Sequence, residues 1–368
     1  MNKSKVYFAN LRTKIGRNLL DKLKILLDNL DIKDIFKEQE LIAVKLHFGE
    51  KGNLSFIRPN FVRVVVDELK RLKTKPFLTD CNTLYRGWRG DSVSHIENAI
   101  FNGFDYAVVN APIIIGDGLT GGSYKKVEVN LEIFKSVSIG SEIARADGLV
   151  VMSHFKCHEL TGFGGALKNL GMGCASREGK LAQHSNISPS VKKKSCIGCE
   201  LCVKICNHGA IIMVDKKAEI LEKHCVGCAE CILVCPKGAI VINWNEQVPV
   251  LQKKMIEYAY GAIKGKRAVY INFLTQISPA CDCYGHNDYP ITRDIGILAS
   301  LDPVAIDMAS VDLVNKEIGN QNTALKSGFN VNEDKFRGVY PEIDWKVQLD
   351  YAEKIGLGRN DYELIGID

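Results

Sequence analysis

Residues Ser195–Ile240 read SCIGCELCVKICNHGAIIMVDKKAEILEKHCVGCAECILVCPKGAI and hold eight of the thirteen cysteines in this chain of 368 residues. The eight cysteines form two runs with the same spacing, C-x2-C-x2-C-x3-C. A glycine lies inside each run, at Gly198 and Gly227, and it permits the positive φ that such tight loops need. The repeated segments CNHGAI and CPKGAI indicate two copies of one loop–helix–strand unit.

The spacing of these cysteines is typical of proteins that hold two 4Fe–4S clusters, where the fourth cysteine of each run ligates the cluster of the other run. The first predicted cluster is held by Cys196, Cys199, Cys202 and Cys235. The second is held by Cys225, Cys228, Cys231 and Cys206. Structural zinc also takes four ligands, so zinc is an alternative. Three thiols from one loop, however, favour binding of an iron–sulfur cluster over zinc. Such a module transfers single electrons.

The composition is that of an ordinary soluble globular protein, with 46% apolar and 25% charged residues. Met1–Lys5 gives no signal peptide, and no apolar run reaches the length of about 18 residues that suggests a membrane span, so we expect a cytoplasmic protein. In a reducing cytosol, clustered cysteines indicate metal rather than disulfides. The sequence contains no basic stripe with interleaved aromatic residues, so we do not expect it to bind nucleic acid. The run Lys192–Lys194 is either a solvated linker or a docking patch for an acidic redox partner.

Strands and helices alternate on both sides of the cysteine-rich stretch, which predicts an α/β fold with a largely parallel sheet and flanking helices. We expect strands at residues 5–10, 41–48, 76–80, 105–110, 147–155 and 267–274, and helices at 15–30, 59–72, 92–101, 250–263 and 300–319. In the last helix, Asp302 suits the N-cap and Pro303 the first turn.

Three segments follow from this pattern. Residues 1–186 and 246–368 are expected to form the two parts of an α/β host domain. Residues 187–245 are expected to be an inserted α+β domain like a bacterial dicluster ferredoxin. An insertion of this size is tolerated best in an exposed loop.

The stretch 153–185 starts at the end of a predicted strand, where α/β folds place their sites. Its site candidates are His154, Cys157, His158, Lys168, Cys174 and His184. The glycines of TGFGG precede a helix-like ALKNL segment and resemble an anion-binding loop, although the sequence is not a Walker A motif. Cys174, near Lys168, is expected to be activated as a thiolate.

A second candidate group lies in SPACDCYGHNDYPITRD, which contains Cys281, Cys283 and His286. Cys281 and Cys283, with Cys174 or Cys157, are predicted to hold a third metal or cluster, for which thiolates favour iron or zinc. The alternative is that these are buried thiols beside a surface histidine.

The predicted pocket rim consists of Lys45, His47, Glu50, Cys81, Asn82, Tyr85, Arg86 and Arg89. Arginine at such a rim suits a carboxylate or a phosphate.

Five stretches, LHFGEKGN, DCNTLYRGWRGD, HELTGFGGALKNLGMG, CDCYGHNDYP and DIGILASLDPVAID, resemble the bacterial and archaeal iron–sulfur proteins called domain of unknown function 362. The resemblance covers nearly the whole chain. Many of those proteins carry the same inserted dicluster ferredoxin, so the resemblance implies iron–sulfur binding. The reaction of that family is not established.

A second resemblance is to lactate racemase-like proteins, which carry a histidine, then glycines and a lysine, then a second histidine. His158, Lys168 and His184 keep that spacing. In that family these residues serve a nickel pincer nucleotide and proton transfer at the 2-carbon of a hydroxy acid. The resemblance implies that Lys168 is a cofactor anchor and that His158 and His184 are ligand or acid–base candidates.

The leading hypothesis is an iron–sulfur electron-transfer protein, a reductase or redox subunit, whose two 4Fe–4S clusters feed a site in the α/β domain. Its catalytic candidates are Lys168, His158, His184 and Cys174. The expected partners are a redox partner protein and a small-molecule substrate. The alternatives are a non-catalytic electron carrier that docks another oxidoreductase and a lactate racemase-like metallocofactor enzyme.

Overall fold

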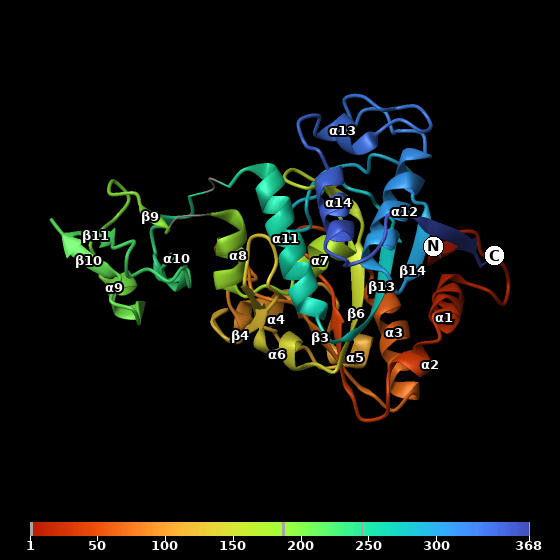
Figure 1. The fold of residues 1–368 in the computed structure, drawn as a ribbon, viewed down its shortest axis with the longest axis horizontal. Coiled ribbons are helices and arrows are strands. Elements are labelled where there is room, and N and C mark those ends of the chain that lie inside the picture. Colours follow the sequence, from red (N-terminus) through yellow and green to blue (C-terminus); the bar gives the residue numbers. More distant parts are fainter. Residues whose placement is uncertain (1–2, 186–187, 244–245, 368) are drawn as a thin grey trace.

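The computed structural model describes residues 3–185, 188–243 and 246–367. Its centre is a seven-stranded sheet with the order β15-β1-β14-β13-β6-β2-β3 (Figure 1). These strands are β1 (Ser4–Asn10), β2 (Leu41–Lys45), β3 (Lys75–Thr79), β6 (Gly148–His154), β13 (Arg267–Leu274), β14 (Gly296–Ser300) and β15 (Tyr362–Gly366). Strand β14 runs antiparallel to both of its neighbours, and the other neighbouring pairs are parallel. The prediction of an α/β fold with a largely parallel sheet is therefore confirmed.

Helices cover both faces of this sheet and bury two hydrophobic cores. Helices α1 (Leu19–Asn29) and α3 (Pro59–Arg71) contribute to one core, and α7 (Ala166–Gly171), α11 (Val248–Ile263), α12 (Pro303–Asn315) and α14 (Lys346–Lys354) to the other. Along β6, Leu149 and Val151 face the second core while Val150 and Met152 face the first, and all four are at most 1% exposed. Burial on both faces is what a largely parallel sheet requires.

Shorter elements complete the fold around this sheet. They are α2 (Ile32–Ile35), α4 (Ser92–Phe101), α5 (Tyr106–Val109), α6 (Ser141–Arg145), α8 (Arg177–His184), α13 (Lys335–Val339) and the paired strands β4 (Tyr124–Glu128) with β5 (Ser136–Gly140) and β7 (Lys156–His158) with β8 (Gly162–Gly164). As predicted, α12 begins at Pro303, and the Asp302 side chain accepts hydrogen bonds from the backbone N–H groups of Val304 and Ala305 at 2.9 and 3.0 Å. Among the described residues, no helix has the length and apolar character that a bilayer crossing requires.

The predicted strand at residues 105–110 is wrong, because this segment forms helix α5. The Asp105 side chain accepts from the backbone N–H groups of Ala107 and Val108 at 2.8 and 3.2 Å, which caps the start of the helix. Asn110 ends the helix in the left-handed region, with φ at 59°. The Asp105 cap and the left-handed end at Asn110 therefore outweigh the strand preference of the two valines between them.

Residues 188–243, here called the cysteine module, leave the host after α8 and return to it before α11, and they project to one side in Figure 1. The module contains β9 (Ser190–Val191), α9 (Leu201–Ile205), β10 (Ile211–Val214), β11 (Lys217–Ile220), α10 (Glu230–Val234) and β12 (Ile240–Val241). Its strands pair with each other, β10 with β11 and β9 with β12. The predicted boundaries at 187 and 245 lie outside the described residues.

The two halves of the module repeat the same backbone conformation. Gly198 and Gly227 have φ values of +72° and +74°, which confirms the positive φ expected of them. Glu200 and Ala229, which precede α9 and α10, also match, with φ values of 62° and 60°. A left-handed conformation is costly for residues with a side chain, so its presence at both positions supports a repeated loop geometry.

Candidate functional site

Two small cavities in the cysteine module are each lined by four cysteines. One is lined by Cys196, Cys199, Cys202 and Cys235. The other is lined by Cys206, Cys225, Cys228 and Cys231. In each cavity, the fourth cysteine of one run therefore lies with the first three cysteines of the other run. This is the grouping in which a dicluster protein binds its two iron–sulfur cubes.

Backbone N–H groups lie beside the sulfur atoms of both cavities. The donors are Ala218 N to Cys196 Sγ at 3.5 Å, Ala239 N to Cys235 Sγ at 3.1 Å and Ala210 N to Cys206 Sγ at 3.3 Å. Hydrogen bonds to sulfur are one of the means by which a protein tunes the potential of an iron–sulfur cluster. Within the described residues, no three Cys, His, Asp or Glu side chains are arranged to share one metal ion. The four thiolates of a cube bind four different irons, so they need not meet at one point.

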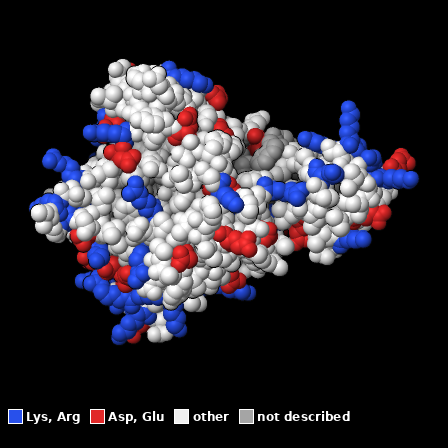
Figure 2. Space-filling view, turned by 180° about the vertical axis from the view of Figure 1, so that it is seen from behind, with Lys and Arg blue, Asp and Glu red and all other residues white. Residues whose placement is uncertain are grey.

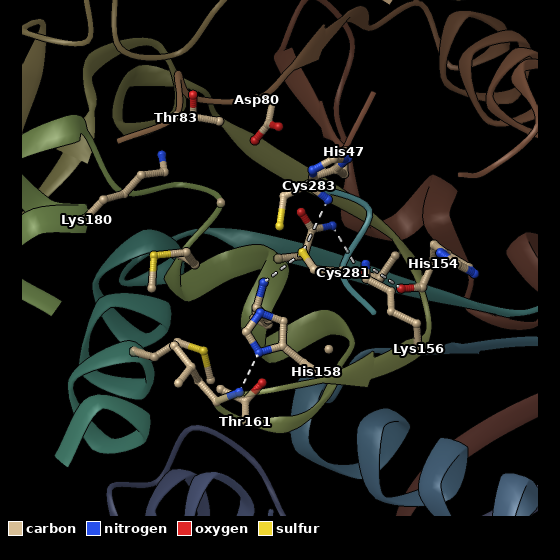
Figure 3. Close-up of a pocket in the computed structure, with 18 of the residues that line it drawn as sticks. His47, Asp80, Thr83, His154, Lys156, His158, Thr161, Lys180, Cys281 and Cys283 are labelled. Atoms are coloured by element: carbon tan, nitrogen blue, oxygen red, sulfur yellow. Dashed lines mark hydrogen bonds between the residues drawn. The ribbon is translucent and has the colours of Figure 1, made fainter. Parts of the chain in front are cut away.

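A larger cavity of about 400 Å³ lies at the carboxyl ends of β2, β3 and β6 (Figure 3). Lys45 is the last residue of β2, Asp80 follows β3, and His154 is the last residue of β6. Parallel strands bring these three residues to one edge of the sheet, where open α/β folds bind their ligands. The predicted site residues that line this pocket are His154, His158, Lys168, His184, Cys281 and Cys283. Five residues of the predicted rim also line it, namely Lys45, His47, Cys81, Tyr85 and Arg89, whereas Glu50, Asn82 and Arg86 do not.

Cys281 lies at the centre of the pocket in Figure 3. Its sulfur accepts a hydrogen bond from Lys168 Nζ at 3.7 Å and another from the backbone N–H of Cys283 at 3.4 Å. A hydrogen bond from the Cys283 thiol holds the pKa of Cys281 well below its usual range, and Lys168 and His158 act in the same direction, although burial opposes them. Burial would lower the pKa of Lys168, but the adjacent cysteines raise it overall. The two groups therefore form a thiolate–ammonium pair.

Histidines 47, 158 and 184 line the same pocket. His158 Nδ1 accepts from the backbone N–H of Leu160 at 3.1 Å, and His47 Nδ1 accepts from that of Gly49 at 2.9 Å, so each neutral ring carries its proton on Nε2. Burial lowers the pKa of His184 to about 3 and holds that of His47 well below its usual range. The rings of His47 and His184 are therefore neutral at pH 7, and they can bind a ligand without adding charge.

A buried ion network fixes the turn that carries the two cysteines. Asp282 lies between them in sequence, and its carboxylate bonds His154 Nδ1 at 2.9 Å and Lys156 Nζ at 3.0 Å. His154 Nε2 lies 2.9 Å from the carbonyl oxygen of Thr275, so both ring nitrogens of His154 have protein partners. His154 therefore positions the turn rather than binding a ligand.

A second network lies on the β2–β3 side of the pocket. Lys45 Nζ is 3.0 Å from Asp80, and Arg89 is 3.6 Å from Asp80 and 3.1 Å from Glu50. Burial would raise the pKa of Asp80, but Lys45 and the neighbouring cations keep it well below its usual range. The two cations, Lys45 and Arg89, are therefore balanced by two carboxylates, those of Asp80 and Glu50, and little net charge remains on this side.

Among the described residues, two lysines line the pocket without a carboxylate partner: Lys168, which is paired with the Cys281 thiolate, and Lys180, whose positive charge has no such counter-ion. Lys168 faces the Cys281 sulfur, and Lys180 Nζ donates to the carbonyl oxygen of Ala175 at 2.6 Å. Neither ammonium group has a carboxylate within ion-pair distance among the residues that the structure describes. A buried ammonium group without a carboxylate partner is a suitable binding partner for an anion.

Cys157 and Cys174 do not line the pocket. Both are fully buried in the hydrophobic core, and burial raises the pKa of Cys174 to about 11. The expectation that Lys168 activates Cys174 is wrong, because the thiol beside Lys168 is that of Cys281. His286 is exposed and also lies outside the pocket lining. The four cysteines considered for a third metal site are therefore not brought together around this cavity.

The glycine-rich loop does not present a free helix N-terminus to an anion. The Asp307 carboxylate of α12 accepts from the backbone N–H groups of Ala166 and Leu167 at 2.8 and 2.9 Å, at the start of α7. A side chain at Gly165 would overlap that carboxylate, so this glycine serves close packing between α7 and α12. The expectation of an anion-binding loop is therefore wrong, since a carboxylate of the chain already occupies the position.

The loop at residues 83–90 connects the pocket with the cysteine module. Leu84 lines the pocket and also packs in the hydrophobic cluster of the module. Tyr85 Oη donates to the carbonyl oxygen of Cys283 at 3.1 Å, and Arg86 Nη1 donates to that of Cys235 at 2.6 Å. Three consecutive residues thus contact the host pocket on one side and the cysteine module on the other.

Sequence reasoning did not select Asp80, Lys156, Lys180 or Asp282 as site residues. Asp80 and Lys156 each follow the end of a buried strand, which is a usable signal for a site at the sheet edge. Lys180 lies in the middle of a short helix, and nothing in the local sequence indicates that it faces a cavity.

Comparisons with known proteins place the chain in a family. Among curated proteins, none matches it. The lactate racemase apoprotein from Thermoanaerobacterium thermosaccharolyticum is a solved structure with 16% identity and a TM-score of 0.39, matching 73% of this chain and 50% of that chain. A protein of known crystal structure from Thermotoga maritima has 10% identity and a TM-score of 0.38, matching 93% of this chain and 60% of that one. The chain therefore spans only half to three fifths of the length of these structures.

The sequence profile described as "Domain of unknown function (DUF362)" matches residues 42–312. The match includes the strands that form the pocket edge, the cysteine module and the turn that carries Cys281 and Cys283. Because it spans well over half of the chain, the protein belongs to the DUF362 family.

Proposed function

We propose that this protein is an iron–sulfur oxidoreductase, in which two 4Fe–4S clusters in the cysteine module exchange electrons with a small anionic substrate in the pocket at the sheet edge. The observation that carries the proposal is the grouping of eight cysteines around two cavities, four to each. We infer that residues 187–245 form a ferredoxin-like insert, since its two halves repeat one loop geometry around these cavities. When bound, the clusters supply one-electron transfer.

The outer end of the module suits the entry of electrons from a protein partner. Cys199 and the lysines Lys192–Lys194 are exposed there. Figure 2 shows Lys and Arg side chains over much of this end of the molecule, with some acidic side chains among them. A basic surface near an exposed cluster ligand attracts an acidic redox partner and speeds its docking.

The pocket residues bind and protonate the substrate. Lys180 supplies positive charge for an anionic group, and Lys168 supplies it beside the reactive sulfur of Cys281. A two-electron reduction also takes up two protons. His158, with its proton on Nε2, and the Lys168 ammonium group lie beside Cys281 and are the nearest donors. A simple electron carrier has no use for such a pocket, which favours an enzyme over a carrier.

A lactate racemase-like metallocofactor enzyme is the second candidate. The observation that favours it is that His158, Lys168 and His184 line one pocket. Nickel bound in stoichiometric amount, and lost in Lys168→Ala, would support this candidate over reduction of an anionic substrate.

Removing single cysteines tests the iron–sulfur proposal. Cys235→Ser and Cys206→Ser, purified anaerobically, are each expected to lose one cube and to fall from about eight to about four irons per chain. Cys157→Ala is the matched control, since this buried thiol lies outside all three cavities, and it should keep the full iron content. Zinc in place of iron, or iron that is unchanged in both serine variants, would overturn the assignment.

A further inference from the structure

Cys281 and Cys283 are placed as a pair rather than as two separate thiols. The backbone N–H of Tyr284 donates to the carbonyl oxygen of Cys281 at 3.1 Å, so residues 281–284 form a tight turn. Both cysteines line the large pocket, and the Cys283 backbone N–H donates to Cys281 Sγ at 3.4 Å. The Cys283 thiol also forms a hydrogen bond with the Cys281 sulfur, so the two sulfur atoms lie within hydrogen-bonding distance of each other.

The residue between the two cysteines holds the turn in place. The carboxylate of Asp282 is fully buried, and it bonds His154 and Lys156 instead of reaching into the pocket. The backbone of the turn is therefore anchored while its two sulfur atoms remain at the cavity. Lys168 Nζ, 3.7 Å from Cys281 Sγ, favours the thiolate form of that cysteine, which is the form that attacks a disulfide.

The pair also lies at the end of the contact between pocket and module. Tyr85 bonds the carbonyl oxygen of Cys283, and the adjacent Arg86 bonds that of Cys235. Two adjacent residues of this loop therefore connect Cys235 of the module with Cys283 of the pair.

We propose that Cys281 and Cys283 are a redox-active dithiol that reduces a small anionic disulfide bound in the pocket. The Cys281 thiolate attacks one sulfur of the substrate, forms a mixed disulfide and releases the first product thiolate. Cys283 then attacks Cys281 Sγ, which closes the Cys281–Cys283 disulfide and releases the second product thiolate. One substrate disulfide is thereby reduced to two thiols, and the dithiol is oxidised by two electrons.

The return step rests on the proposed function, because two one-electron reductions from the module, together with two protons, reopen the disulfide. The substrate class follows from the charge of the pocket. Lys180, together with Lys168 once the Cys281 thiolate has entered the mixed disulfide, favours a disulfide that carries carboxylates, and the cavity of about 400 Å³ admits a small one.

Trypsin gives a direct assay, since cleavage after Arg267 and Arg293 releases a peptide whose only cysteines are Cys281 and Cys283. The full-length chain is purified anaerobically, reduced, freed of reductant and exposed to dithiodiglycolate, which is a small anionic disulfide. Acid quenching, alkylation with iodoacetamide and mass spectrometry then read this peptide. We expect the peptide to be lighter by two hydrogens and to carry no alkyl group, because its two cysteines form a disulfide. Treatment with dithiothreitol before alkylation should restore the reduced peptide.

Matched probes and variants sharpen the result. Neutral 2-hydroxyethyl disulfide should oxidise the pair roughly tenfold more slowly than dithiodiglycolate, because the pocket attracts anions. Cys283→Ser should stop at a mixed disulfide on Cys281, and Cys281→Ser should form none. Equal rates with the two probes would overturn the substrate class. A peptide that is alkylated at both cysteines after exposure to the probe would overturn the dithiol itself.

A metal at the pair would overturn the proposal as well. The contradicting result is zinc or iron that stays bound to the chain when both clusters are absent. The same metal would have to be missing from Cys281→Ser. The thiol assay does not depend on the clusters, and iron analysis does not depend on these two thiols. Failure of the dithiol and failure of the iron–sulfur proposal can therefore be told apart.

Discussion

Lys168 sets the chemistry of the pocket, because its ammonium group is the cation nearest to the Cys281 sulfur, at 3.7 Å. Lys168→Met removes the charge while keeping most of the side-chain volume. We expect alkylation of Cys281 by iodoacetamide at pH 7 to slow by about tenfold for each unit by which the thiol pKa rises. Lys168→Arg keeps the charge and should stay close to the wild-type rate. If Lys168→Met reacts as fast as the wild type, this lysine does not stabilise the thiolate.

Asp117 predicts a pH dependence of stability. It is fully buried, Oδ1 accepts from Asn82 N and Nδ2 at 2.9 Å each, and no hydrogen-bond partner of Oδ2 lies among the described residues. Burial raises the pKa of this carboxyl to about 6. Because the folded pKa is raised, the stabilisation is complete below the unfolded pKa and is lost as the pH rises through the folded pKa.

Asp117→Asn removes this titration. Between pH 4 and pH 6.5, the free energy of unfolding of the wild type should fall by about 2 kcal/mol relative to the variant, and the difference should then change little. Urea unfolding of both chains at each pH measures this difference. Parallel curves over the whole range would show that Asp117 ionises normally in the folded chain.

Contacts between residues far apart in the chain explain what sequence reasoning missed at this scale. The cysteine grouping follows from a spacing of a few residues, so it could be predicted. Lys168 and Cys281 are 113 positions apart, and Asp307 and Ala166 are 141 apart. A periodic pattern of neighbouring residues does not indicate which residues so far apart in the chain come into contact. For this reason the sequence wrongly points to Cys174 for the role that Cys281 has, and to the glycine-rich loop as an anion site.

At the scale of elements, the loop at residues 83–90 is held by the host as well as by the module. Arg177 of α8 donates from Nε and Nη2 to the carbonyl oxygen of Thr83 at 3.1 and 3.0 Å, and it also bonds that of Gly90. Both ends of the loop are therefore fixed by one buried guanidinium group. This leaves Tyr85 and Arg86 in defined positions between the pocket and the module.

Arg86→Ala tests the contribution of this loop to docking. A hydrogen bond from a charged group contributes about 1.5–3 kcal/mol, so we expect amide hydrogen exchange in α10 to speed up by roughly ten- to a hundredfold. Arg145→Ala is the control, because Arg145 is 72% exposed and, among the residues that the structure describes, it pairs with the nearby Glu142 alone. Unchanged exchange in α10 of Arg86→Ala would show that the module does not depend on this contact.

Elements with strong capping or periodic signals could be predicted, and short ones could not. Helix α4 and strand β13 lie where the sequence places them, because each combines a clear period with a clear end. Strands β14 and β15 were not predicted, and β15 depends on pairing with β1 at the other end of the chain. Pairing across such a distance is a property of the fold and not of the five residues in the strand.

For the whole molecule, the proposed function gives a reason why the cysteine module is joined to a larger α/β host. The module contacts the host beside the pocket, through Leu84, Tyr85 and Arg86. A cluster module and a substrate pocket that share one loop can exchange electrons without a diffusion step between two proteins.

The central claim is that the eight cysteines bind two iron–sulfur cubes, and iron and acid-labile sulfide per chain test it most directly. On the intact chain purified under anaerobic conditions, we predict about eight of each, a brown colour and a paramagnetic signal after reduction with dithionite. A colourless chain without iron, sulfide or such a signal would contradict the account.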